Sequence, residues 1–348
     1  MAMAPDLGRN MVEQVMIGGV EVTRATLRSP SLTPLGCPLQ ERLHLVADGA
    51  VTDFNELEKV EIGMVEMSAE DKLEVQDKAG AADQTTAPLA EKLNKVARVV
   101  AVMSGKGGVG KSLVASLLAV ALRREGQEVG VLDADITGPS IPKMFGITGH
   151  PAASPLGILP MDSSGGVKVM SINLLLPSED DAVIWRGPLI SGAIRQFWQE
   201  VVWGDLSTLV VDLPPGTSDA SLTVMQSMPL SGVVLVTSPQ DLAGMVVRKA
   251  AKMAEHLDIP ILGLVENMSY FVAPDTGQRY DIFGPSHAKA TAAQLGVPLL
   301  GQLPLDRQIA ELSDRGQIED YPGEAFVPIA QSLIETTPVA KEPPALEH

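Results

Sequence analysis

Cysteine and aromatic residues are scarce in this 348-residue sequence. The single cysteine, Cys37, excludes a disulfide within the chain, and with aromatics at 3% the core must be filled by aliphatic side chains and methionine. The sequence has no run of about 18 or more apolar residues, the length that a membrane-spanning helix requires. Its first residues also lack the basic and apolar regions of a secretion signal. We therefore expect a cytoplasmic protein that has no membrane partner.

Positive charge is also in short supply. The sequence has 26 lysines and arginines against 43 aspartates and glutamates, which gives a formal net charge of −17. Proteins that bind nucleic acid nonspecifically present a basic surface, so this charge argues against a nucleic-acid partner. Hydrophobic residues nevertheless make up 45% of the chain, enough for a substantial core in one large or two ordinary domains.

A glycine-rich stretch, residues 104–112, is the most informative feature that is present. It fits the phosphate-loop pattern G-x-x-x-x-G-K-[ST], with Gly105, Gly110, Lys111 and Ser112 at the fixed positions. Glycines allow a tight turn in which successive backbone N–H groups point into one concavity and bind phosphate oxygens. In such loops the lysine reaches the β- and γ-phosphates and the hydroxyl ligates Mg²⁺. The residues predicted to contact ATP here are Gly105, Lys106, Gly107, Gly108, Val109, Gly110, Lys111 and Ser112.

The residues on either side of this stretch have the strand and helix patterns that a phosphate loop requires. Residues 99–103 form a short apolar run typical of a buried strand, and apolar residues recur at helical spacing from Leu113 to Leu122. Gly126 then follows as a helix stop signal. Because a strand, a glycine loop and a helix N-terminus together form an anion site, a chance match to the pattern is a poor explanation.

From residue 98 onward, apolar strand patterns alternate with helical patterns such as that of residues 241–257. Together with the phosphate loop, this alternation predicts an α/β fold, a P-loop NTPase with a mostly parallel sheet and helices on both faces. The strands are predicted at residues 98–103, 128–132, 208–212, 232–237, 261–265 and 299–303.

Four segments are predicted along the chain. Residues 1–66 contain strand-like runs at 20–23 and 44–47, and we expect them to form a small N-terminal α/β domain. Residues 67–92 have the composition of a flexible linker, and residues 93–336 hold the P-loop ATPase domain. Residues 337–348, rich in proline and glutamate, are predicted to be a disordered tail.

Carboxylates follow two of the predicted strands. Asp133 and Asp135 stand two residues apart after one strand, and Asp212 ends another. Ligands in open α/β sheets bind outside the carboxyl ends of the strands. One carboxylate could therefore orient the attacking water while another holds Mg²⁺, although an acidic turn or a solvated aspartate is the simpler alternative at each place. In the turn after Asp212, the N–H of Gly216 could contact the γ-phosphate.

The second lysine of the loop, Lys106, carries a resemblance to a known family. The segment GKGGVGKS, residues 105–112, resembles the deviant Walker A motif of the MinD, ParA and nitrogenase-iron-protein class. Within that class the chain most resembles the Mrp/ApbC family of iron–sulfur cluster carrier ATPases. Residues 36–39 are similar to part of the small domain often found upstream in that family. The other resembling segments, in the family's order, are residues 132–140, 185–188, 211–217, 266–271, 281–284 and 303–306.

The resemblance implies a homodimer that binds two ATP molecules with Mg²⁺ and hydrolyses them. Lys106 would reach across the interface to the partner's phosphates, and Asp135 would orient the attacking water. Asp212 would hold the Mg²⁺ shell with Ser112, and Asn267 would hydrogen-bond the adenine. The cargo would be an iron–sulfur cluster, and the partners would be iron–sulfur apoproteins or cluster-assembly proteins. The residues expected to act in catalysis are Lys106, Lys111, Asp135 and Asp212.

The cluster ligands are where this sequence departs from the family pattern. The family's C-x-x-C motif falls at Ala273 and Thr276 here, so neither thiolate is present. Iron–sulfur clusters are normally held by four thiolates, whereas a dimer of this chain has only its two copies of Cys37, in another domain. No iron–sulfur ligands are therefore identified, and a cluster bridged at the usual place lacks support. Cys37 itself is either a small buried hydrophobe or a reactive thiol.

Two other functions fit the same motifs. One is a cluster-free dimeric ATPase switch of the MinD/ParA type, and the other is a regulator of cluster assembly.

Two further side chains each have two possible roles in any of these functions. His287 either contacts a phosphate or partner or lies in a surface loop, and Arg186 is either an interface cation or part of a surface salt bridge.

Overall fold

The computed structural model describes residues 21–23, 26–33, 59–66, 90, 94–135, 138–154, 157–175, 187–217 and 219–340. The chain divides into two compact units. The first consists of residues 1–92 with 152–159, and the second of residues 93–151 with 160–348. The phosphate loop and the other candidate residues that the structure describes belong to the second unit.

The described part of the first unit contains a three-stranded sheet of β1 (Glu21–Thr23), β2 (Thr26–Thr33) and β3 (Lys59–Glu66). β1 pairs with β2 in the antiparallel sense, and β2 pairs with β3 in the parallel sense. β7 (Ala153–Ser154) and β8 (Gly157–Ile158) form an antiparallel pair. β1 matches the strand predicted at residues 20–23, whereas Cys37, residues 44–47 and residues 67–89 lie outside the described part. The domain and linker bounds therefore stay predictions.

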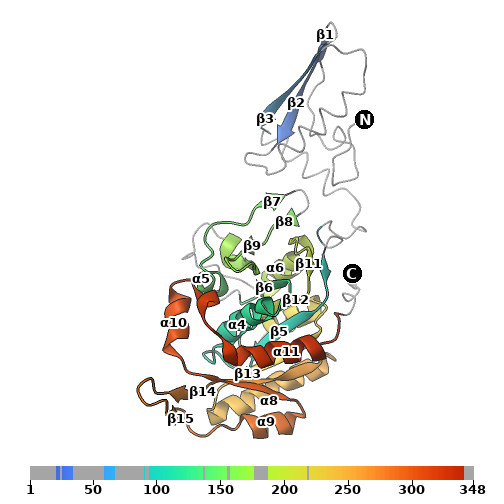
Figure 1. Cartoon of the computed structure of the whole chain (residues 1–348). Coiled ribbons are helices and arrows are strands. Elements are labelled where there is room, and N and C mark those ends of the chain that lie inside the picture. The colour runs from blue at the N-terminus through green and yellow to red at the C-terminus, as the bar shows by residue number, and fades with distance from the viewer. Residues whose placement is uncertain are drawn as a thin grey trace. The chain divides into compact units, whose positions relative to one another are not determined.

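The second unit is built around a nine-stranded sheet in the order β15-β14-β13-β5-β12-β6-β10-β9, with β16 paired to β14 (Figure 1). Its pairs are parallel except those of β14 with β15 and of β10 with β9. β4 (Lys95–Val96) and β11 (Asp205–Leu206) form a separate parallel pair. The strands of the large sheet are β5 (Val99–Ser104), β6 (Val129–Asp133), β9 (Met161–Asp162), β10 (Lys168–Ser171), β12 (Thr208–Asp212), β13 (Gly232–Thr237), β14 (Ile261–Val272), β15 (Arg279–Tyr280) and β16 (Leu299–Pro304).

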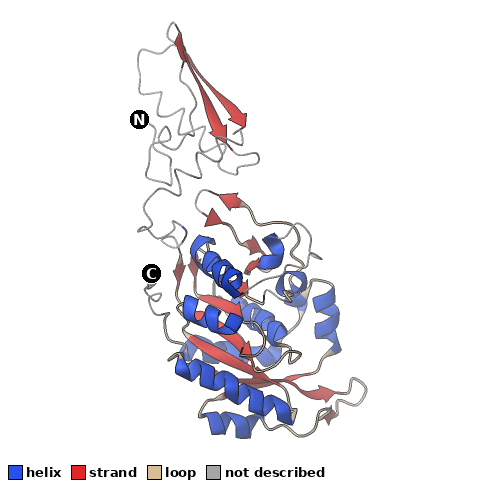
Figure 2. Ribbon diagram, turned by 180° about the vertical axis from the view of Figure 1, so that it is seen from behind, coloured by secondary structure: helices blue, strands red, loops and turns tan. Residues whose placement is uncertain are grey.

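Helices cover both faces of this sheet, as predicted (Figures 1 and 2). On one face, α4 (Lys111–Arg124) lies beside α11 (Val327–Thr336) and α5 (Ile141–Met144), and α5 contacts α10 (Arg307–Asp314). On the other face, α8 (Asp241–His256) packs on β13 and β5, and α9 (Ala288–Leu295) lies next to it against β14. The remaining described helices are α6 (Gly187–Glu200) and α7 (Asp219–Ser227), which contact each other, and the short 3₁₀ turns η1 (Ile172–Leu175), η2 (Ile318–Asp320) and η3 (Glu324–Phe326).

The apolar runs that predicted the strands are explained by burial of the central strands on both faces. Every residue of β5, β6, β12 and β13 is buried. Alternate side chains point to opposite faces, so Val100 and Val102 pack in one cluster with Val114 and Leu118 of α4. Strands that are covered on both faces need an apolar residue at nearly every position, which is what makes them visible in the sequence.

The chain after α11 returns to the beginning of β5. The N–H of Ala340 donates to Ala97 O over 2.8 Å, and Arg98 Nε donates to Thr337 O over 3.1 Å. Thr337 itself is buried. Residues 337–340, the start of the tail predicted to be disordered, are thus held in place by hydrogen bonds, and residues 341–348 lie outside the described part.

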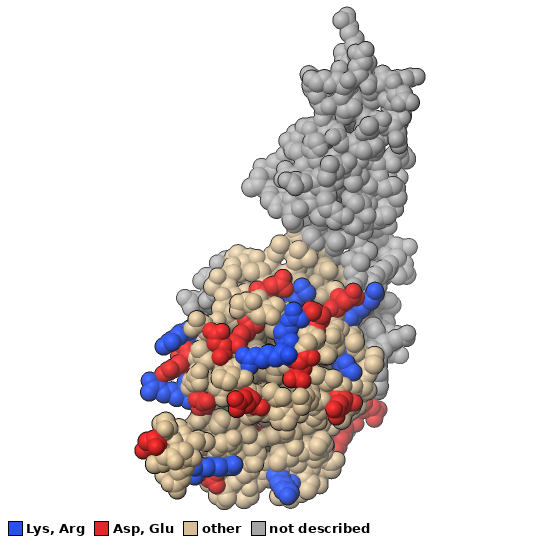
Figure 3. Space-filling model, viewed as in Figure 1, with Lys and Arg blue, Asp and Glu red and all other residues tan. Residues whose placement is uncertain are grey.

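The surface of the second unit carries mixed charge. On the face shown in Figure 3, lysine and arginine side chains alternate with aspartate and glutamate, and neither sign dominates a broad area. That face therefore offers no extended basic surface to a polyanion. Among the described residues, no helix combines the length and the apolar character needed to cross a membrane.

Candidate nucleotide site

The phosphate loop connects β5 to α4 at the carboxyl edge of the sheet. Gly108 and Gly110 have φ angles of 79° and 77°, in the left-handed region that only glycine enters without strain. α4 begins directly after the loop, at Lys111, so its first N–H groups point toward the loop. A Cβ on Gly105 would collide with the backbone of Val246 in α8, which explains glycine at the first fixed position. The loop thus has the geometry of an anion site at a helix N-terminus.

Lys111 lies at the centre of a buried charge cluster. Its ammonium donates to Asp212 Oδ1 over 2.7 Å and to Ser112 Oγ over 3.3 Å, and it lies 4.0 Å from Asp135 Oδ2. The Lys111 side chain is 5% exposed and that of Asp212 is fully buried. The structure therefore brings together the lysine, the hydroxyl and both carboxylates that the sequence placed in one site. Removing the lysine would leave buried negative charge without its counter-ion.

Asp212 has an oxygen that matches the needs of a hydrated metal ion. Its Oδ2 is buried and accepts no hydrogen bond from the described residues. Burial raises the pKa of this carboxyl, while the neighbouring Lys111 opposes the rise. A carboxylate oxygen beside a serine hydroxyl is a donor set typical of Mg²⁺, which keeps several of its own waters. The residues present therefore fit the predicted ion.

Asp133 holds the segment that carries Asp135. Its Oδ1 accepts from the N–H of Asp135 over 3.2 Å, and its Oδ2 accepts from the N–H groups of Ser140 and Ile141 over 3.1 and 3.2 Å. The hydroxyl of Ser171 on β10 donates to Oδ2 over 3.3 Å. One buried carboxylate thus ties both ends of the loop between β6 and α5 to a neighbouring strand. Burial and, second, the charge of Asp212 raise the pKa of Asp133 to about 8.

This raised pKa predicts a pH dependence of stability. Because native Asp133 binds its proton more tightly than an unfolded aspartate of pKa 3.8, its contribution to stability is lost as the pH rises from about 4 to about 8. Asparagine does not titrate, so the Asp133→Asn protein should show a shallower fall of unfolding free energy over that range. Urea unfolding at a series of pH values measures the slope. Equal slopes in the two proteins would contradict the assignment, whatever their absolute stabilities.

Lys106, the lysine specific to the deviant motif, is held within its own chain. Its ammonium donates to Gln240 Oε1 over 2.6 Å, and Gln240 is the residue that precedes α8. The contact is exposed, so it is a weak restraint that other hydrogen bonds can replace. Sequence analysis did not identify Gln240, since nothing local distinguishes a glutamine before a helix. The role of Lys106 across a dimer interface stays a prediction.

Asn267 and Gly216 also reach the loop, each through a backbone contact. Asn267 is buried and donates from Nδ2 to Val109 O over 3.0 Å. The next residue, Met268, has a φ of 55°, in the left-handed region. The pairing of β14 with β16 shifts register between Glu266 and Tyr270. The N–H of Gly216 donates to Ser104 O over 3.0 Å. Both residues therefore support the loop, while their predicted contacts with adenine and γ-phosphate stay predictions.

The two positions of the family's C-x-x-C motif lie in a tight turn after β14. The N–H of Gly277 donates to Ala273 O over 2.8 Å, and Thr276 Oγ1 accepts from the N–H of Gln278 over 3.3 Å. No group of three or more histidine, cysteine, aspartate or glutamate side chains that could hold a metal ion occurs among the described residues. His287 is exposed and immediately precedes α9, and Arg186 lies outside the described part.

Comparisons with known proteins identify relatives for most of the chain. A family model described as "ParA: NUBPL iron-transfer P-loop NTPase" matches residues 95–336. An "Iron-sulfur cluster carrier protein" of Methanocaldococcus jannaschii is 46% identical over 265 residues, which cover 74% of this chain and 91% of that protein. A protein of the same name from Synechocystis is 39% identical over 341 residues, covering 94% of this chain and 93% of that protein.

Solved structures agree with the sequence matches. A nucleotide-binding protein from Archaeoglobus fulgidus, in complex with ADP, is 43% identical and superposes with a TM-score of 0.62, covering 72% of this chain and 96% of that one. The cell division ATPase MinD of Pyrococcus furiosus, 23% identical, shares the fold with a TM-score of 0.52, covering 68% of this chain and 98% of that one. With the phosphate loop, the buried Lys111 cluster and these relatives, the chain belongs to the iron–sulfur cluster carrier family of P-loop NTPases.

Proposed function

We propose that this protein is a dimeric, Mg²⁺-dependent ATPase that carries iron–sulfur clusters to apoproteins. The observation that carries the ATPase part is the position of Lys111, with its ammonium beside Ser112 and Asp212 at the head of α4. The carrier part is supported by relatives of that name, which are 39% to 46% identical to this chain. Partners would include iron–sulfur apoproteins and cluster-assembly proteins.

ATP would bind with its phosphates over the loop of residues 105–112. Lys111 would then exchange its bond to Asp212 for the β- and γ-phosphate oxygens, which are stronger acceptors because they carry more charge. Backbone N–H groups of the loop and the first turn of α4 would bind the remaining oxygens. Ser112 and Asp212 would hold Mg²⁺, directly and through its water shell, and the ion would neutralise charge that develops on the phosphates.

Hydrolysis would require groups on both sides of a dimer interface. Asp135 is 8% exposed and would orient the attacking water from within its own subunit. Lys106 would leave Gln240 and contact the phosphates of the partner subunit. Such a cation, added only when two subunits close, stabilises the transition state more than the ground state and makes hydrolysis depend on dimerisation.

A cluster-free ATPase switch, or a regulator of cluster assembly, is the second candidate. The observation that favours it is the turn at residues 273–276, where alanine and threonine stand at the positions of the two thiolates. In both candidates the nucleotide site is the same. They differ only in whether the dimer itself carries the cluster.

The ATP-binding part is tested with Lys111→Ala, which should bind ATP roughly 100-fold more weakly because one charged partner of the phosphates is lost. Titration with a fluorescent ATP analogue measures the affinity. Lys249→Ala, which removes an exposed lysine of α8, is the matched control and should bind normally. Because Lys111 also neutralises buried carboxylates, Ser112→Ala serves as a second variant and should lose the Mg²⁺ dependence. Unchanged affinity in a folded Lys111→Ala protein would remove this loop from the site.

A further inference from the structure

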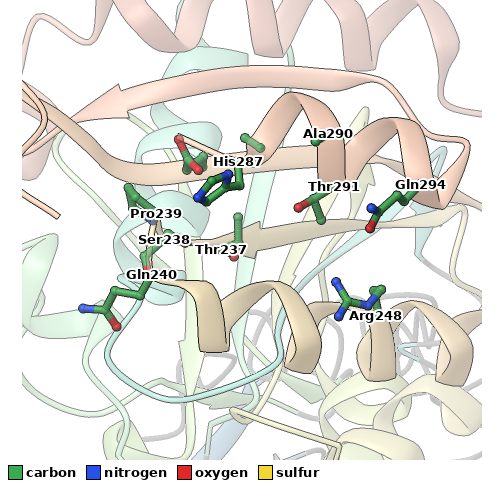
Figure 4. A pocket seen from close by; sticks show the side chains of 11 residues that line it. Thr237, Ser238, Pro239, Gln240, Arg248, His287, Ala290, Thr291 and Gln294 are labelled. Atoms are coloured by element: carbon green, nitrogen blue, oxygen red, sulfur yellow. Dashed lines mark hydrogen bonds between the residues drawn. The ribbon is translucent and has the colours of Figure 1, made fainter. Parts of the chain in front are cut away.

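Lys106 is held within its own chain at two points. Its ammonium donates to Gln240, which lies at one end of a cavity of about 220 Å³ between α8 and α9 (Figure 4). That contact is exposed. The carbonyl oxygen of Lys106 accepts from Ser104 Oγ over 3.0 Å, and Ser104 is buried. Because water competes less for the hydroxyl of a buried residue, this second contact restrains the loop more firmly than the first.

Ser104 also accepts a hydrogen bond from the turn that follows β12. The N–H of Gly216 donates to Ser104 O over 3.0 Å. Gly216 has a φ of 81°, in the left-handed region that favours glycine. Ser104 therefore contacts the turn through its backbone oxygen and the segment of Lys106 through its hydroxyl. Any movement of Gly216 away from Ser104 thus changes the bonding of a residue that supports Lys106.

A side chain of α7 holds the same turn. Ser221 is buried, and its hydroxyl donates to Pro214 O over 3.0 Å and to Gly216 O over 3.3 Å. These two oxygens belong to the peptide groups before and after the one that carries the Gly216 N–H. Ser221 thus fixes the two flanking peptide groups, while the middle group is held by Ser104.

The middle peptide group, between Pro215 and Gly216, can turn without moving its neighbours. Because the group is planar, such a turn changes ψ of the residue before it and φ of the residue after it. The proline ring restricts φ of Pro215 but leaves ψ variable, and glycine tolerates a wide range of φ. With both flanking groups fixed, the N–H of Gly216 can therefore point either to Ser104 O or to a second acceptor nearby.

We propose that Ser221 is the positioning residue of a switch that detects the γ-phosphate of bound ATP. Ser221 holds the turn while the Gly216 N–H moves from Ser104 O to a γ-phosphate oxygen. The phosphate oxygen is the stronger acceptor because it is charged, whereas the oxygen of Ser104 is neutral. The turn begins two residues after Asp212, which bonds to Lys111, so both acceptors lie at the same edge of the sheet.

This inference rests on the proposed function, because it requires ATP in the loop of residues 105–112, and it adds the part of the chain that responds to the nucleotide. ADP has no γ-phosphate, so with ADP the N–H of Gly216 stays on Ser104 O. With ATP that bond is given up, and both the segment of Lys106 and α7 contact the residues that change. α7 in turn contacts α6, so the difference between the two nucleotide states reaches this pair of helices.

The test compares ADP with adenylyl imidodiphosphate, a non-hydrolysable ATP analogue, by titration calorimetry in the presence of Mg²⁺. Ser221→Ala removes the hydroxyl and adds no bulk, so it should fold. We expect its affinity for ADP to be unchanged and its affinity for the analogue to fall about tenfold, which corresponds to the loss of one well-placed hydrogen bond. Ser227→Ala, at a half-buried serine of the same helix, is the matched control and should bind both nucleotides normally.

The ratio of the two affinities separates positioning from a general loss of structure. A purely structural role for Ser221 would weaken both nucleotides equally and keep the ratio, which would overturn the proposal. Ser221→Thr keeps the hydroxyl and should keep the ratio. If threonine lowers it as alanine does, packing and not the hydroxyl sets the ratio, and the proposal is wrong. Binding of neither nucleotide to the unaltered protein would contradict the proposed function itself, whereas normal binding with an unchanged ratio in Ser221→Ala would overturn only the role of Ser221.

Discussion

The Lys106→Ala protein is expected to bind ATP with nearly unchanged affinity and to hydrolyse it about 10³-fold more slowly, the lower end of what a cation supplied across an interface contributes. In the structure the ammonium of Lys106 donates to Gln240 Oε1, whereas that of Lys111 donates to Asp212 Oδ1. Its loss should therefore leave the loop and its buried charges intact. Steady-state hydrolysis and nucleotide affinity, measured on the same preparation, separate the two effects.

Two further proteins decide how Lys106 acts. Gln240→Ala removes the acceptor of the same hydrogen bond and leaves Lys106 in place. If Lys106 gives up this bond before hydrolysis, the variant should keep full activity. Mixing Lys106→Ala with Asp135→Ala subunits should restore hydrolysis, because one site of each mixed dimer then has both its own aspartate and the partner's lysine. No activity beyond that of either variant alone would mean that the lysine does not act in trans.

The fold could be predicted where its signals are local and continuous. β5, β12 and β13 are buried on both faces, so each is an unbroken apolar run, and each was predicted within about a residue of its observed bounds. β14 is longer than predicted, because it continues past residue 265 through the polar Glu266 and Asn267. β10 was not predicted: it is four residues long and begins with Lys168, which gives no periodic pattern.

The same distinction applies to the site: some of its features are local in the sequence and could be predicted, and others arise only from tertiary contacts. The phosphate loop is contiguous in sequence and could be identified by its spacing alone. The bond between Lys106 and Gln240 joins residues 134 positions apart, and a bond from Gln302 Nε2 to Glu266 Oε2 joins β16 to β14. Asp133 was noted as one of two strand-end carboxylates, but its four bonds to the following loop and to β10 depend on the folded chain. No sequence pattern specifies such contacts in advance.

The Ala273→Cys/Thr276→Cys protein is expected to gain a stable iron–sulfur cluster at about one per dimer, whereas the unaltered protein should bind less and lose it readily. An alkyl group and a neutral hydroxyl do not compete with thiolate for iron, and four thiolates from two chains would complete the usual ligand set. The two positions share one turn after β14, closed by the bond from Gly277 N–H to Ala273 O, which does not involve either side chain. The substitutions should therefore keep this backbone bond and lose only the exposed one from Gln278 N–H to Thr276 Oγ1.

Anaerobic reconstitution with iron and sulfide, followed by visible absorption and iron and sulfide analysis, measures cluster content. Ala273→Ser/Thr276→Ser is the matched control, since it changes the same positions without adding thiolates, and it should gain nothing. Cys37→Ser removes the natural thiol and should abolish whatever weak binding the unaltered protein shows. A stable, stoichiometric cluster in the unaltered protein that survives Cys37→Ser would contradict the ligand argument, because it would require ligands other than this chain's cysteine. It would then favour the carrier over the cluster-free switch, with side chains of this chain other than cysteine completing the site.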